Sequence, residues 1–350
     1  SFLFLFIAVL EESGYMSRVV FLMDRIMRRF GLSGKSIVPL ISGTACAIPA
    51  IMATRNIESW KERLITILVT PFTTCSARLP VYLIIIALVI PEGRILGLSY
   101  QALTLMLLYL IGFGTAIVSA YILNKILKIR SKTFFVVEMP NYKLPLFKNV
   151  ALTVIEKTKA FIFGAGKIIL AISIVLWFLA SYGPGEQFND AENIVTAANV
   201  SENLSTEELQ QKIASHKLEH SFIGIAGHAI EPTIRPLGYD WKIGIAIVSS
   251  FAAREVFVGT LATIYSVGSD EEETIKNRMA NEINPTLGGP LFTFASGISL
   301  LLFYAFAMQC MSTLAIVKKE TNTWKWPILQ LVIMTAFAYI VALIAFQFLK

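Results

Sequence analysis

The chain has 350 residues, of which 55% are hydrophobic and 15% charged, and its mean hydropathy is +0.65. Ordinary soluble domains carry about 25% charged residues, so this composition excludes that class and indicates a membrane protein. The net charge of +6 does not indicate nucleic-acid binding, because the basic residues gather in short loops, where they determine which side of the membrane a loop occupies.

The chain begins within an apolar run, SFLFLFIAVL at residues 1–10, which is too short to span a bilayer. No basic start and no small-residue cleavage site, the marks of a signal peptide, precede it. We therefore expect the sequence to be a piece of a longer protein.

The segment GLSGKS at residues 31–36 resembles the end of a nucleotide-binding P-loop. The first glycine of that motif is missing, because Arg29 stands five residues before Gly34, and an amphipathic helical pattern precedes it instead of a strand. We predict a turn here, with Ser33 or Ser36 as the N-cap of the helix that follows.

Two apolar segments contain residues that break helices. Residues 36–54 contain Pro39, Gly43 and Pro49, and the segment TPFTTCSARLP at 70–80 contains two further prolines. Proline inside a helix removes a hydrogen bond and clashes with the preceding turn. Non-helical backbone at membrane depth is tolerated only where it is buried in protein or lines a cavity. Both segments are therefore predicted to be broken helices.

Six stretches approach or exceed the ~20 residues that a spanning helix needs. They are 64–90, 101–123, 160–182, 243–267, 291–317 and 327–349. Residues 124–159 are rich in lysine and arginine, whereas residues 183–220 are acidic. The positive-inside rule therefore places 124–159 in the cytoplasm and 183–220 outside, and it also places KKETNTWK at 318–325 inside.

A weak internal repeat links the two halves of the chain. An offset of 207 residues pairs Gly31 with Gly238, and an offset of 235 residues pairs Cys75 with Cys310. Matched interrupted segments in two halves point to the midplane site of a transporter.

The repeat divides the chain into five predicted parts. Residues 1–123 form the first gate repeat, 124–159 a basic cytoplasmic connector with an amphipathic helix, 160–182 a transmembrane span, 183–220 an extracytoplasmic acidic loop, and 221–350 the second gate repeat with the C-terminal span.

The candidate metal ligands are Cys46, Cys75 and Cys310, which all lie in apolar segments close to the breaks. Thiolate sulfur suits Fe(II), Zn(II) and Cu(I), but a cysteine also packs well as a small apolar side chain. The residues alone leave both interpretations open. Glu255, deep in an apolar span, is a candidate carboxylate of an ion path, and a structural ion pair with Arg254 is the alternative.

His216 and His220 stand at i and i+4 in the acidic loop, a spacing that can bind zinc. The segment is polar, and Ser205 and Glu208 form a capping box at its start. The sequence therefore favours an ordinary solvated helix over a metal site.

Together these motifs resemble the membrane domain of the bacterial ferrous iron transport protein B (FeoB) family. The segments that carry the resemblance run in order from about residue 11 to 326: EESGYMSRVVFLMDRIMRRFGLSGKS, GTACAIPAIMATR, PFTTCSARLPVY, VVEMPNYKLP, PLGYDWKIGIAIVSSFAAREVFVGTLATIY and QCMSTLAIVKKET. The chain departs from the family in lacking its N-terminal GTP-binding domain. Gln309 also stands before the third cysteine, where many relatives have proline.

The resemblance implies an all-α, polytopic transmembrane bundle with two gate-type repeats that contain broken or re-entrant helices. It implies Fe(II) uptake across the bacterial cytoplasmic (inner) membrane, along a path between the repeats that is lined by Cys46, Cys75, Cys310 and Glu255. No enzymatic activity is expected of this segment, since GTP and Mg would act only through the missing N-terminal domain. That domain, a small cytoplasmic accessory protein and a second copy of the chain are the implied protein partners, alongside the lipid bilayer.

Three other functions compete with iron transport. A nucleoside-type or other organic-solute transporter could use the same broken helices, and it predicts a polar and aromatic pocket that holds a base. A membrane anchor for a GTPase, or a structural scaffold, would not need buried charges or matched helix breaks. The sequence therefore favours the iron permease.

Overall fold

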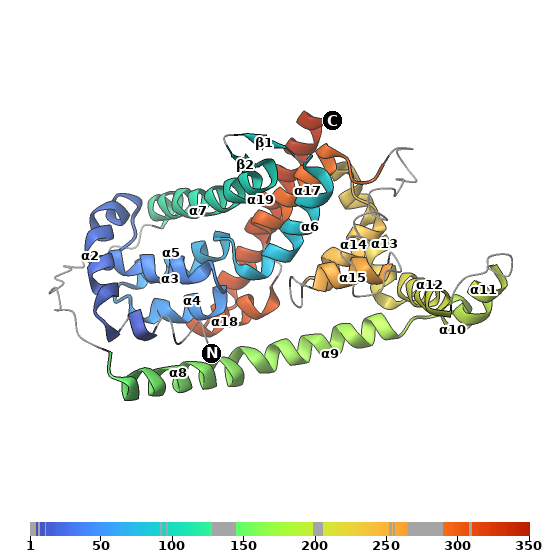
Figure 1. Cartoon of the computed structure of the whole chain (residues 1–350). Helices are drawn as coiled ribbons and strands as arrows, with labels where there is room; N and C mark the ends of the chain where they lie inside the picture. The colour runs from blue at the N-terminus through green and yellow to red at the C-terminus, as the bar shows by residue number, and fades with distance from the viewer. Residues whose placement is uncertain are drawn as a thin grey trace. The chain divides into compact units, whose positions relative to one another are not determined.

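The computed structural model describes residues 5, 8–10, 12–91, 93–95, 97–127, 145–198, 206–251, 254, 256–264, 290–307 and 310–350. Regular structure in these residues is helical (Figure 1), apart from a two-stranded antiparallel hairpin of β1 (Arg94–Ile95) and β2 (Leu98–Ser99). The predicted all-α fold class is confirmed.

The first half consists of short helices followed by longer ones, where η marks a single 3-10 or π turn. They are α2 (Tyr15–Met27), η1 (Arg28–Phe30), η2 (Gly34–Ser36), α3 (Ile37–Gly43), α4 (Ala47–Ala53), η3 (Thr54–Asn56), α5 (Trp60–Val69), η4 (Thr70–Phe72), η5 (Ser76–Arg78), α6 (Leu79–Val89), α7 (Tyr100–Ile126), α8 (Phe147–Phe161), the π turn η6 (Ile162–Gly166) and α9 (Lys167–Ser181).

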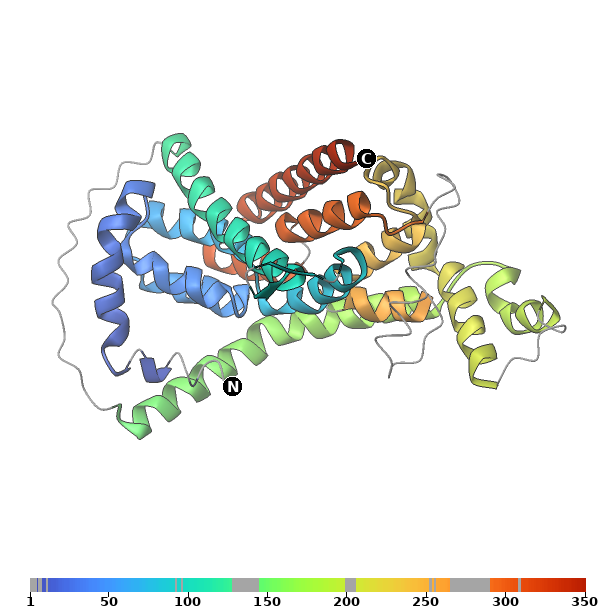
Figure 2. The same ribbon diagram turned by 45° about the horizontal axis from the view of Figure 1, so that its top comes forward.

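The second half repeats the pattern of short helices and ends in a long one. Its elements are α10 (Glu186–Asn189), α11 (Ala191–Ala198), α12 (Thr206–Glu219), α13 (Phe222–Ile234), η7 (Arg235–Leu237), α14 (Trp241–Ser249), α15 (Val256–Ile264), α17 (Phe294–Phe306), α18 (Met311–Thr321) and α19 (Lys325–Leu349). Figure 2 shows α10, α11 and α12 as a small yellow-green group of helices, in which α11 packs on α12.

Four segments found among the described residues are long and apolar enough to cross a membrane, and one of them, which joins α17 and α18, runs across residues 308–309 outside that set. They are Trp60–Val89, Tyr100–Ile126, Phe294–Thr321 and Lys325–Leu349. They confirm four of the six predicted spans, and the protein is a multi-pass membrane protein. The predicted span 160–182 contains the shorter apolar helix α9, and 243–267 contains α14 and α15 with a break between them.

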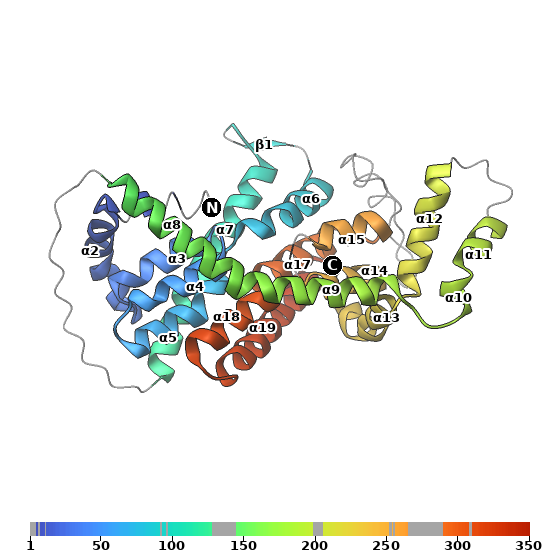
Figure 3. The same ribbon diagram turned by 90° about the horizontal axis from the view of Figure 1, so that it is seen from below.

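The chain divides into two compact units, each built from three separate stretches. Unit 1 comprises Ser1–Ser76, Leu107–Ile169 and Ser312–Ile333, and unit 2 comprises Ala77–Met106, Leu170–Met311 and Met334–Lys350. Fully buried side chains mark the core of each unit: Leu40, Ile51, Leu64 and Ile65 in unit 1, and Tyr82, Ile85, Ile245 and Tyr304 in unit 2. In unit 1, α3 and α4 lie side by side (Figure 3).

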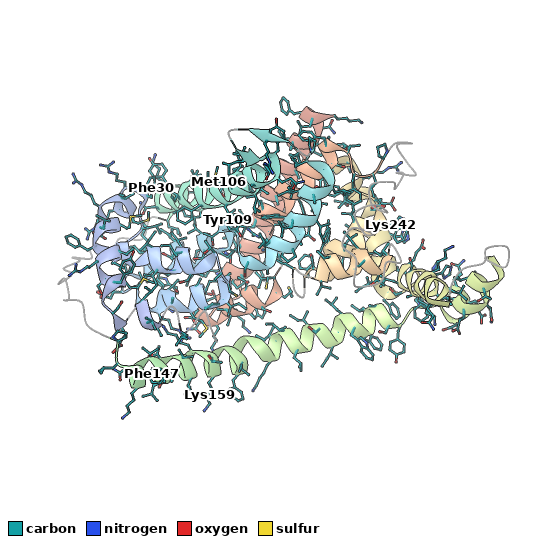
Figure 4. All side chains as sticks on the ribbon, in the orientation of Figure 1. Phe30, Met106, Tyr109, Phe147, Lys159 and Lys242 are labelled. Atoms are coloured by element: carbon teal, nitrogen blue, oxygen red, sulfur yellow. The ribbon has the colours of Figure 1, made fainter. Side chains whose placement is uncertain are left out.

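The internal repeat is visible in the backbone. Gly31 ends η1 with a φ of +77°, and Gly238 ends η7 with a φ of +83°. Other residues adopt this left-handed conformation only with strain, which explains a glycine at both matched positions. Each glycine precedes a helix that breaks within a few turns, and Lys242 (Figure 4), matched to Lys35, lies at the start of α14. The two glycine conformations therefore agree with the 207-residue offset.

The segment GLSGKS forms a turn and η2 after the helix α2, with no preceding strand. Ser33 is the N-cap residue of η2 and Ser36 that of α3, as predicted, although neither side chain accepts a cap hydrogen bond. The Asp24 carboxylate in α2 accepts the Gly34 N–H at 2.8 Å. A carboxylate from a neighbouring helix therefore binds the first N–H of this turn.

Candidate metal path at the helix breaks

The first break separates α3 from α4 in unit 1. Cys46 lies in it with an extended backbone (φ −157°, ψ 133°) and is half-buried. Pro49 occupies the third position of α4, where a missing N–H costs little. Its ring prevents the helix from continuing backwards, because it would clash with the carbonyl of Ala45, four residues earlier. The Ala45 carbonyl is consequently left without its usual helical partner.

The second break follows η4 and contains Thr73, Thr74 and Cys75. Two glycines allow this segment to lie close to helices of unit 1. A Cβ on Gly43 of α3 would lie 2.5 Å from the Thr73 hydroxyl, and one on Gly112 of α7 would lie 2.7 Å from the Thr74 hydroxyl. Both threonines are buried, whereas Cys75 keeps partial exposure.

The two breaks meet through a pair of hydrogen bonds. Ser76 donates its hydroxyl to the Ala45 carbonyl at 2.7 Å and its backbone N–H to the same oxygen at 3.4 Å. Cys46 and Cys75 are each one residue away from this contact. The structure therefore brings together the two breaks that carry these predicted ligands, and both cysteines are partly accessible.

An equivalent contact holds the breaks of unit 2. The Met311 N–H donates to the Phe251 carbonyl at 3.1 Å, and the buried Arg254 side chain donates to the Ala307 carbonyl at 3.2 Å. The 235-residue offset relates Met311 to Ser76, whereas the 207-residue offset relates Ala45 to Ala252, so the acceptor Phe251 lies one residue before the matched position. Cys310 directly precedes Met311 and is half-buried.

The borders of the units follow the same symmetry. The first stretch of unit 1 ends at Ser76, and its third stretch begins at Ser312, directly after Met311. As a result α6, from the first repeat, packs on α17 and α15 in unit 2, and α18, from the second repeat, packs in unit 1. The cysteines Cys75 and Cys310 thus each precede a point where the chain passes from one unit to the other.

Metal-ligand geometry is limited to what the described residues contain. Glu255 lies outside them, although Arg254 and Val256 on either side are included. Arg254 binds a backbone carbonyl. Among the described residues, no group of three histidine, cysteine, aspartate or glutamate side chains is placed to hold a metal ion. The three cysteines, all of them described, form no disulfide.

Sequence reasoning missed a buried charge cluster at the far end of α4. Glu320 of α18 has a side chain that is 2% exposed, and it binds Arg55 at 2.6 Å and Arg63 of α5 at 2.7 Å. Between this cluster and the first break lies an apolar cluster with which Cys46 and Trp326 pack: Ile48, Ile51, Ile67, Ile316 and Val317. The sequence did contain a signal for this cluster. Arg63 in α5 and Glu320 in KKET (318–321) carry opposite charges, and both lie next to apolar stretches.

Buried side chains fill the space next to the first break on the side of α5 and α18. The apolar cluster and the Glu320 ion pairs join α4, α5 and α18 in unit 1. A hydrated cation cannot pass through a dry apolar cluster, because it would lose its water without gaining ligands. Helices α4, α5 and α18 therefore pack together beside the first break, and the apolar cluster between them offers an ion no polar ligand.

Comparison with known families gives two matches. The Gate family, described as nucleoside recognition, matches residues 1–89 and 162–324. The family of the ferrous iron transport protein B C terminus matches residues 105–157. Together these matches cover most of the chain. No solved structure is similar.

Three relatives illustrate the similarity. The chain is 46% identical over 349 residues to the Fe(2+) transporter FeoB of Leptospira interrogans, covering 99% of this chain and 48% of the relative. It is 36% identical to FeoB of Staphylococcus aureus strain MSSA476, of which it covers 45%. It is also 36% identical to a fusion of Fe(2+) transport protein A with FeoB in Porphyromonas gingivalis, of which it covers 41%.

The chain spans about half the length of the Leptospira and Staphylococcus relatives. Its matched broken helices, its multi-pass character and the two family matches agree with one another. The chain belongs to the ferrous iron transport protein B family, of which it represents the membrane domain with its gate repeats.

Proposed function

We propose that this membrane domain carries Fe(II) across the bacterial cytoplasmic membrane. The supporting observation is the contact between Ser76 and Ala45, which places Cys46 and Cys75 at adjoining breaks of a membrane-embedded unit. The names of the relatives favour Fe(II) over an organic solute.

Each break supplies a soft donor and backbone carbonyls that lie outside regular helices. Fe(II) accepts thiolate sulfur, and carbonyl oxygens of broken helices can replace part of its water shell. A site with few protein ligands releases its ion readily, which conduction requires. In this proposal Cys46 and Cys75 bind the ion together, Cys310 acts at the matched break of unit 2, and Glu255 offsets its charge.

On the cytoplasmic side, the apolar cluster and the Glu320 ion pairs would block passage while they are intact. Passage would require both to separate. We assign the driving step to a GTP-binding domain in the full-length protein, so that this segment itself has no enzymatic role. The fusion of transport protein A with FeoB in one relative supports a small accessory protein as a partner of the whole transporter.

The test is Fe(II) uptake by full-length protein in proteoliposomes. The double variant Cys46→Ser/Cys75→Ser should lose uptake by at least about tenfold, since even second-shell changes at metal sites cost 10–100-fold. Met106→Leu (Figure 4) is the control, because it also removes a sulfur but from a half-exposed position on α7. Uptake that is unchanged in the double variant, or competition by nucleosides and not by Mn(II), would contradict the proposal.

A further inference from the structure

Helix α12 in unit 2 carries two imidazoles that face each other. The His216 and His220 rings are stacked with centroids 4.5 Å apart and planes inclined by 25°. Both side chains are only partly exposed. Ser205, the first residue of the predicted capping box, lies outside the described residues. The prediction of an ordinary solvated helix is therefore judged from the geometry of the two histidines.

Hydrogen bonding orients the second imidazole for metal binding. The Nδ1 atom of His220 lies 3.0 Å from the His216 carbonyl oxygen. A carbonyl can only accept, so Nδ1 carries the proton and the Nε2 lone pair stays available. This is the arrangement of most metal-binding histidines, in which the remote ring nitrogen is fixed by a backbone carbonyl or a carboxylate.

The first imidazole also has an unused nitrogen. No described residue offers a hydrogen bond to the buried Nδ1 of His216. A neutral imidazole is the form that binds a metal.

Neighbouring contacts hold α12 against the second gate repeat. Ser215, next to His216, donates its hydroxyl to the Ile264 carbonyl at the end of α15, at 2.7 Å. Leu218 of α12 lines a cavity of about 210 Å³ together with Ser249 and Val256, the residues on either side of the break between α14 and α15. The histidine pair is therefore attached to the helix that begins at this break.

We propose that His216 and His220 form a binding site for a divalent transition metal on α12. Two imidazoles at i and i+4 supply two ligands on one helical face, and water completes the coordination. Such a site binds weakly and exchanges its metal quickly. Metal binding by these two histidines does not depend on the proposed transport of Fe(II). A role of this site in delivering metal to the gate would rest on the proposed function.

The experiment measures Zn(II) binding to the full-length protein in lipid nanodiscs by competition with a fluorescent chelator. All variants carry Cys46→Ser, Cys75→Ser and Cys310→Ser, which removes thiolate binding and separates this test from the proposed metal path. His216→Gln/His220→Gln should weaken the Zn(II) binding of this background by at least about tenfold. His228→Gln is the matched control, since His228 lies on α13 and stacks on Trp241, and it should leave binding unchanged.

A second measurement guards against misfolding of the double variant. Zn(II) that bridges one turn of α12 should slow hydrogen exchange of its backbone amides in the histidine-containing protein and not in the variant. Equal Zn(II) affinity with and without His216 and His220, or an equal loss in His228→Gln, overturns the proposal. Exchange in α12 that does not respond to Zn(II) also overturns it.

Discussion

The Ser76 hydroxyl donates a 2.7 Å hydrogen bond to the carbonyl oxygen of Ala45, an oxygen that Pro49 prevents from joining a helix. One sequence feature, a proline at the third position of α4, therefore creates the acceptor that joins two breaks. A backbone hydrogen bond, from the Met311 N–H to the Phe251 carbonyl, also joins two break segments in unit 2. Both units therefore hold their breaks together by hydrogen bonds to a backbone carbonyl.

Replacing Pro49 tests whether the break depends on this proline. Pro49→Ala restores an N–H that can bond to the Ala45 carbonyl, so α4 should extend backwards and compete with Ser76. Stability should change by less than about 1 kcal/mol, because the proline stands in a first turn, while Fe(II) uptake should fall strongly.

Pro39→Ala is the control for this prediction. Pro39 holds the same third position in α3, but the carbonyl four residues before it belongs to Lys35, outside the break. Uptake that falls equally in both variants, in proteoliposomes of full-length protein, would show that proline content rather than the break matters.

Gly112 should be required for the position of the second break. A Cβ at Gly112 would lie 2.7 Å from the Thr74 hydroxyl and 3.1 Å from the Phe72 carbonyl oxygen. Gly112→Ala should therefore destabilise the protein by about 1–3 kcal/mol through overpacking. Gly114→Ala, two residues on in α7 with no atom within 4 Å, should stabilise it by up to about 1 kcal/mol.

Apparent melting temperatures in detergent measure both effects. The expected order is Gly114→Ala at or above the original protein and Gly112→Ala below it. The same sign of shift for both variants would mean that helix propensity, and not contact with Thr74, determines the result.

Among the charged side chains of unit 1, Glu320 should contribute most to the stability of the fold. Its buried carboxylate binds two arginines, and hydrogen bonds to charged groups contribute roughly 1.5–3 kcal/mol each. Glu320→Gln should lower the apparent melting temperature clearly. Glu58→Gln makes the same chemical change at a carboxylate whose side chain is 75% exposed in its pair with Lys35, and it should have no measurable effect. Equal effects would contradict the assignment.

The local stability of α12 should depend on pH. The pKa of His216 is lowered by burial and by His220, although Glu219 opposes the shift. The unfolded helix therefore takes up the proton at a higher pH than the folded one. The stabilisation is complete above about pH 6.5 and is lost as the pH falls from there towards the folded-state pKa.

Hydrogen exchange of α12 amides, corrected for intrinsic rates, measures this dependence. Protection should decrease between pH 7.5 and 5.5 in the original protein and change less in His216→Gln. A variant that loses protection just as steeply would exclude His216 as the titrating group.

Much of the architecture could be predicted from the sequence, because hydropathy, proline and the repeat act locally. The breaks near Cys46 and Cys75 follow from Pro49 and from the uncharged segments around them. Gly31 and Gly238, aligned in the sequence, share the same left-handed backbone conformation. The serines lie at the predicted N-cap positions, but their side chains accept no cap hydrogen bond, and Asp24, ten residues before Gly34, accepts the first N–H of the turn. Such a tertiary contact leaves no periodic signal.

Long-range partners escaped prediction for the same reason. Glu320 and Arg55 are 265 residues apart, and each alone reads as an interfacial charge. The passage of α18 into unit 1 was also invisible, since a repeat alignment shows that two segments are alike but not which elements pack together. The role of Glu255 remains a prediction.

The most direct test of the metal path uses Cd(II), a soft ion whose thiolate complexes absorb in the ultraviolet. In full-length protein with Cys310→Ser, the account predicts an absorbing Cd(II) site that uses Cys46 and Cys75 together. Adding either Cys46→Ser or Cys75→Ser should reduce its affinity by about tenfold or more. If each single variant binds Cd(II) as tightly as the protein with both cysteines, the two thiols do not share an ion and the account is contradicted.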